Sequence, residues 1–80
     1  MEVLFFGIAR DIVGRSAMEI SELGRVPRSV SELKRSLQST FPEFGKLSSL
    51  AVAVNSEYAE DSVILEQGDE VAIIPPVSGG

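Results

Sequence analysis

The chain has 80 residues, of which 44% are apolar and 24% are charged, so it has room for one small folded domain and no second core. Its formal net charge is −5, and it contains neither cysteine nor histidine. These absences exclude a thiol nucleophile, an imidazole base, a disulfide and a zinc site built on those residues. The negative charge disfavours nucleic acid as a partner, because phosphate binding requires a basic surface. We therefore expect a binding surface or a reactive terminus rather than a deep active site.

The N-terminal segment from Glu2 to Ala9 is rich in residues that favour strands and is apolar on both alternating faces. This pattern predicts a central strand, with a bulge or a close backbone approach at Gly7. The apolar run is too short for a membrane helix, and it follows Glu2 rather than a basic stretch. We interpret it as a strand, not a signal segment, and expect a cytoplasmic protein with no membrane partner.

A hairpin and a helix are predicted next. Residues 10–15 are expected to connect the first strand to a return strand over 16–21. Ser29 and Glu32 form a capping-box pattern that begins a helix, and Pro42 ends it. The helix has one apolar face, made by Val30, Leu33, Leu37 and Phe41.

The C-terminal half predicts three more strands. Residues 50–54 form a compact apolar run, Tyr58 begins a short edge strand, and residues 71–74 form a last strand after a turn at Gly68. The resulting order predicts an α+β fold of the β-grasp type, a mixed sheet with one main helix and with the first and last strands side by side. The rival split βαβ sheet needs a second helix that this pattern does not supply. We assign residues 1–74 to this domain and 75–80 to a flexible tail.

An acidic cluster near a predicted loop is the only candidate for a cation site. It contains Glu57, Glu60 and Asp61, but their spacing matches no known calcium loop. We interpret these side chains as a solvated surface and predict no metal site.

The end of the chain is its most unusual feature. It carries no charged side chain and consists of Pro75, Pro76, Val77, Ser78, Gly79 and Gly80. Prolines stiffen the exit from the last strand, and glycines without a β-carbon can enter a narrow channel. The only reactive group at the tip is the α-carboxylate of Gly80, a poor acyl donor that a second protein must activate, for instance with ATP. A frayed terminus without function is the alternative.

Several of these segments resemble one family, the small subunit of molybdopterin synthase. The resemblance covers essentially the whole chain and includes residues 4–6, 53–55 and 68–71. Its most specific part is the terminal run Pro-Pro-Val-Ser-Gly-Gly over residues 75–80. The chain departs from the family at Gly7, where alanine is frequent.

The resemblance implies a ubiquitin-like sulfur carrier. An adenylyltransferase resembling the ubiquitin-activating enzymes would use ATP to adenylate Gly80, which would then become a thiocarboxylate. The tail would enter the large synthase subunit, which would be its partner in a heterotetramer, and would donate sulfur to a cyclic pyranopterin. The chain would bind no cofactor and would act as a co-substrate without side-chain catalysis.

Three alternatives stay open at this point: a sulfur carrier of thiamine synthesis, a protein modifier joined to lysines through Gly80, and an interaction domain with an idle tail. For docking, we predict an exposed apolar patch made by Phe6, Tyr58 and Ile74, provided that the first and last strands are neighbours. Burial of Phe6 in the core is the competing interpretation.

Overall fold

The computed structural model describes residues 1–24, 26–47 and 50–75. Within them, five strands form one mixed sheet in the order β2-β1-β5-β3-β4. The strands are β1 (Glu2–Phe5), β2 (Ala17–Glu19), β3 (Ala51–Val54), β4 (Glu57–Ala59) and β5 (Glu70–Ile74). The central pair, β1 and β5, is parallel, and the other neighbouring pairs are antiparallel. The predicted pairing of the first and last strands is therefore confirmed.

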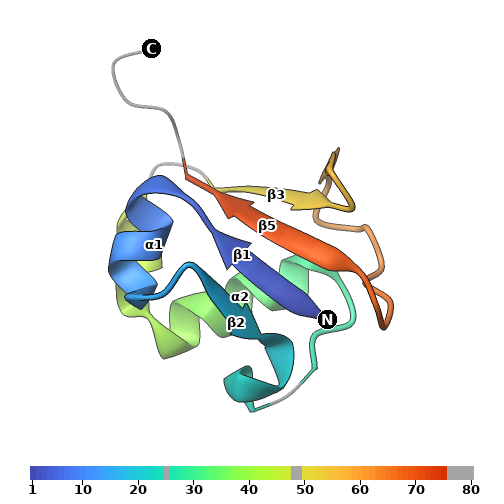
Figure 1. Ribbon diagram of the computed structural model, residues 1–80, viewed down its shortest axis with the longest axis horizontal. Helices are drawn as coiled ribbons and strands as arrows, with labels where there is room; N and C mark the ends of the chain where they lie inside the picture. Colours follow the sequence, from blue (N-terminus) through green and yellow to red (C-terminus); the bar gives the residue numbers. More distant parts are fainter. Residues whose placement is uncertain (25, 48–49, 76–80) are drawn as a thin grey trace.

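The main helix α2 (Val30–Thr40) lies along one face of this sheet (Figure 1). Its residues Val30, Leu33 and Leu37 are fully buried, as the apolar spacing predicted. They belong to one core with inward side chains of the three central strands: Val3, Phe5, Val52, Val71 and Ile73. The core thus fills the layer between α2 and the sheet, and α2 leaves the opposite face of the sheet uncovered.

The start of α2 follows the predicted capping box in part. The Oγ of Ser29 accepts a hydrogen bond from the backbone N–H of Glu32 at 3.2 Å, as expected of an N-cap. The Glu32 carboxylate accepts from the backbone N–H of Arg28, at 3.3 Å, one residue before the cap. The Ser29 hydroxyl thus satisfies a backbone donor that the start of the helix leaves free, and the Glu32 carboxylate binds the backbone just before the cap.

The prediction that the first strand continues to Ala9 is wrong, because β1 ends at Phe5 and the helix α1 (Gly7–Val13) follows. Residues 10–13 are accordingly helical rather than a connection. The sheet explains the change: Phe5 pairs with Ile73 near the end of β5, and Pro75 has no N–H to continue a ladder. Gly7 is not in a bulge; its φ of +54° allows the chain to leave the strand and enter the helix.

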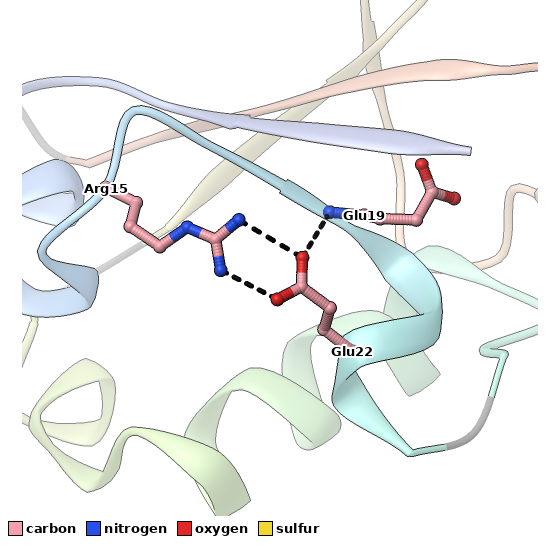
Figure 2. Close-up of polar contacts among 3 residues, drawn as sticks. All are labelled: Arg15, Glu19 and Glu22. Carbon is pink, nitrogen blue, oxygen red and sulfur yellow. Dashed lines mark hydrogen bonds and ion pairs between the residues drawn. The ribbon is translucent and has the colours of Figure 1, made fainter.

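The return strand is also shorter than predicted. β2 ends at Glu19, and a 3-10 helix, η1 (Ile20–Leu23), takes the remaining residues. Glu22 holds this bend, since its carboxylate accepts the backbone N–H of Glu19 at 3.0 Å and two hydrogen bonds from Arg15 at 2.7 and 3.2 Å (Figure 2). Arg15 and the Glu19 N–H together hold the pKa of the Glu22 carboxyl below its usual range.

A second 3-10 helix, η2 (Pro42–Lys46), follows α2, which ends before Pro42 as predicted. It buries Phe44, whose ring packs edge-on against Phe41 with centroids 6.1 Å apart. In the described part of the chain, no helix is long and apolar enough to cross a membrane.

Candidate docking site

The uncovered face of the sheet is the candidate functional site. Side chains alternate between the two faces of a strand, so Leu4 and Ala72 point away from α2 while Val3 and Val71 point toward it. Leu4 pairs with Ala72, Ala72 with Ala53, and Ala53 with Tyr58. These four positions therefore form a row across β1, β5, β3 and β4.

This face holds an open hollow of about 300 Å³. The small side chains Ala53 and Ala72 lie in the middle of the row, and larger side chains surround them. The lining residues, which we call the docking patch, are Leu4, Phe6, Ala53, Ser56, Tyr58, Glu70, Ala72 and Ile74. The structure thus brings together all three side chains predicted for docking, Phe6, Tyr58 and Ile74.

Phe6 lies at the surface and outside the buried core. Its side chain is 50% exposed, whereas its neighbour Phe5 is 2% exposed. The backbone explains the difference, because Phe6 still donates its N–H to the carbonyl of Ile73, at 3.3 Å, and so keeps the strand's alternation. Tyr58 is exposed further, at 77%, and Ile74 is half-buried. Two aromatic rings are therefore available to a partner on this face.

The tail begins beside the docking patch, since β5 ends at Ile74 and Pro75 follows directly. A β-carbon on Gly7 would lie 3.4 Å from the Cγ of Pro75, so the start of α1 adjoins the start of the tail. Pro76, Val77, Ser78, Gly79 and Gly80 lie outside the described residues. Their predicted flexibility and the predicted chemistry at Gly80 stay predictions.

The patch can bind, but its side chains offer little for catalysis. Its titratable groups are the Glu70 carboxylate and the Tyr58 phenol, and the chain has no cysteine or histidine to act as nucleophile or base. Among the described residues, no group of three or more acidic side chains lies close enough to hold a metal ion. Asp61 of the acidic cluster instead accepts a hydrogen bond from Nζ of Lys34 at 2.7 Å. The exposed apolar side chains of this surface fit recognition of another protein.

Sequence reasoning missed most of the hollow's lining: Leu4, Ser56, Ala53, Glu70 and Ala72. The signal was the parity of the strands, since Leu4 and Phe6 share a face, as do Ala72 and Ile74. That signal was ambiguous because both faces of β1 are apolar. Only the position of α2 determines which face is the core and which is exposed.

Comparison with known proteins shows which family this chain is similar to. The model of the ThiS family matches residues 3–80. The molybdopterin synthase sulfur carrier subunit of Arabidopsis thaliana is 36% identical, over 100% of this chain and 82% of its own length. That of Homo sapiens is 33% identical, over 100% of this chain and 93% of its own length.

The fold of this chain is also similar to that of a solved structure. That structure comes from Pyrococcus furiosus and is assigned as molybdopterin converting factor, subunit 1, with a TM-score of 0.81 and 24% identity over 95% of both chains. The match confirms the predicted β-grasp fold. On the family model and the full-length relatives, this chain belongs to the ThiS family.

Proposed function

We propose that the chain is a sulfur carrier in molybdenum cofactor biosynthesis and acts as the small subunit of molybdopterin synthase. The observation that carries the proposal is the full-length similarity to sulfur carrier subunits, at 36% and 33% identity. The docking patch supports it, because an exposed apolar face directly adjoins the start of the tail. A carrier needs this combination of a surface for partners and a terminus that reaches into them.

The proposed chemistry takes place on the C-terminal carboxylate of Gly80. In the first step the carboxylate attacks the α-phosphorus of ATP in an activating enzyme, which forms an acyl-adenylate and releases pyrophosphate. A sulfur donor then displaces AMP, and the product is a thiocarboxylate. In the large subunit, sulfur passes to a cyclic pyranopterin while water restores the carboxylate. ATP is consumed by the activating enzyme, and the carrier itself holds no cofactor.

The two partners would use the docking patch in turn. In this proposal the activating enzyme and the large subunit cover Phe6, Tyr58 and Ile74, while the tail extends from Pro75 into each active site. The large subunit supplies the acid–base groups that this chain lacks, and two copies of each subunit form a heterotetramer. The proposal places these steps in the cytoplasm, which fractionation of cells expressing the untagged chain would check.

The decisive experiment measures the intact mass of the chain after incubation with the activating enzyme, ATP and a sulfur source. The full chain should gain the mass difference between sulfur and oxygen, and the thiolated chain with the large subunit should produce molybdopterin. Deletion of Gly80 should abolish both results, because it withdraws the reactive carbon by about 3.5 Å. Gly79→Trp should block the channel, whereas the control Ser78→Ala keeps the tail's length and should be active.

The same assay separates the alternative functions. Thiazole formation by the thiolated chain would favour the thiamine pathway. Isopeptide bonds between Gly80 and lysines of other proteins would favour a protein modifier. Full activity of the Gly80 deletion in all three assays would refute a carrier and leave an interaction domain with an idle tail.

A further inference from the structure

The charges of this chain are divided unequally along its length. All seven lysine and arginine residues lie at or before Lys46, whereas six of the twelve acidic residues lie after it. The folded chain places the acidic segment in β4, in the loop that follows it and at the start of β5. The edge of the sheet formed by β4 and the loop after it therefore carries negative charge, and this segment contains no basic residue to offset it.

A second open hollow lies at this edge, with a volume of about 320 Å³. Its lining includes two exposed apolar side chains, Ile64 at 65% and Tyr58 at 77% exposure. Three carboxylates also line it, and we call the whole set the β4-edge surface: Glu57, Tyr58, Ile64, Glu66 and Asp69. Since Tyr58 lines both hollows, this surface is continuous with the docking patch.

One of the three carboxylates, that of Asp69, is held in place by hydrogen bonds. The Asp69 carboxylate accepts the backbone N–H of Glu66 at 2.8 Å and the side-chain amide of Asn55 at 3.0 Å. These two hydrogen bonds hold the pKa of Asp69 below its usual range, so the group stays ionised at neutral pH. Within the described residues, Glu57, Glu66 and Asp69 form no ion pair with a basic side chain.

The β4-edge surface can add to the area that a partner covers on this chain. Stable subunit contacts bury about 800 Å² per partner, which is about a sixth of the 5007 Å² surface of this chain. The docking patch has only two large hydrophobic side chains that are half exposed or more, Phe6 and Tyr58. The patch alone therefore offers few large apolar side chains for a lasting contact, and adjoining surface can extend it.

We infer that the β4-edge surface extends the docking patch and binds a segment of the large synthase subunit in which an apolar side chain is flanked by lysine or arginine. This inference rests on the proposed function and specifies the partner's chemistry. Ile64 and Tyr58 receive the apolar side chain, and the carboxylates of Glu57, Glu66 and Asp69 face the basic groups. The carboxylates speed the encounter and orient the chain, and the apolar contact slows its release.

The test compares two variants of the full chain that have the same net charge. Glu57→Lys with Glu66→Lys reverses the β4-edge surface, whereas Asp11→Lys with Glu43→Lys reverses two exposed acidic residues of α1 and η2. We expect the first variant to associate with the large subunit about tenfold more slowly at low salt. The difference should nearly vanish at about 1 M salt, where charges are screened beyond about 3 Å. The second variant should associate much as the unmodified chain does.

A third variant, Ile64→Ser, tests the apolar contact. It should leave the melting temperature unchanged, because the Ile64 side chain is 65% exposed, and should dissociate about fivefold faster. Equal slowing by both charge variants, no salt dependence, or unchanged dissociation of Ile64→Ser would overturn the inference. An effect seen only with the activating enzyme would overturn the choice of partner. Failure of the unmodified chain to bind the large subunit would instead refute the proposed function.

Discussion

Removal of the Tyr58 ring tests the docking patch most directly. Tyr58 is 77% exposed, and an aromatic side chain covers about 150–250 Å² when fully buried. A partner could therefore cover at least 100 Å² of the ring, for about 2.5 kcal/mol or more at about 25 cal/mol per Å². Part of that gain is offset by ordering of the side chain. We expect Tyr58→Ala to weaken binding of the large subunit by about 2 kcal/mol, or about 30-fold in Kd.

Titration calorimetry with the purified large subunit gives the Kd, and thermal melting of the free chain gives the stability. The melting temperature should stay nearly constant, because exposed side chains contribute little to folding. Val26→Ala is the matched control, since Val26 is 59% exposed but lines a different hollow with Ile20 and Leu65. An unchanged Kd for Tyr58→Ala, or an equal loss with Val26→Ala, would show that the docking patch is misplaced.

Three further predictions concern the fold. Leu33 is fully buried under the sheet, so Leu33→Ala should lower the free energy of unfolding by about 3 kcal/mol in urea denaturation. Ser29→Ala removes the acceptor for the Glu32 N–H and should lower the free energy of unfolding by about 1 kcal/mol in the same assay. Ser29→Asp keeps an acceptor at this position and should retain most of that stability. The Glu66 N–H lowers the pKa of Asp69 in the folded chain. The ionised Asp69 carboxylate therefore stabilises the folded chain above the unfolded pKa of about 3.9, and this contribution is lost as the pH falls through the folded pKa. Asp69→Asn should therefore show a shallower loss of melting temperature on acidification below about pH 4, and an unchanged slope would contradict this.

The elements that the sequence predicted well are those whose local pattern and tertiary environment agree. The helix α2 has a cap at Ser29, an apolar face and a proline after its end, and all three signals specify the same segment. The strand β5 likewise has a glycine turn before it and Pro75 after it. Local chemistry alone was sufficient in both cases.

The error at α1 arose from long-range pairing. Residues Ile8 and Ala9 continue the apolar run of β1, and nothing local separates them from a strand except Gly7. The strand ends because its partner β5 ends at Ile74, one position after the Phe5–Ile73 pair. A helical signal was present, since Ala9 and Val13 are four residues apart and both pack toward the core. Recognising it required knowledge of where the sheet stops.

The docking site shows the same division between local and long-range information. Phe6, Tyr58 and Ile74 were predicted because the expected pairing of the first and last strands places Phe6 near Ile74, with Tyr58 at the adjacent turn. The alanines of its floor carry no such signal; Ala53 and Ala72 matter only because strand pairing places them side by side. Ile64 was missed because a single aliphatic residue in a loop is ordinary in sequence, and its exposure emerges only from the fold.

The fold and the proposed function both depend on the fact that α2 covers only one face of the sheet. A sheet with two apolar faces requires cover on both, and a chain of this size has only α2 and short helical segments with which to cover it. The core uses the face with Val3, Phe5, Val71 and Ile73, and the face with Leu4 and Ala72 stays open. A second helix over that face would stabilise the monomer but would also close the surface beside which the tail begins. In the proposed function, the uncovered face is thus a cost in stability that a carrier keeps, because a partner has to cover this face and release it again.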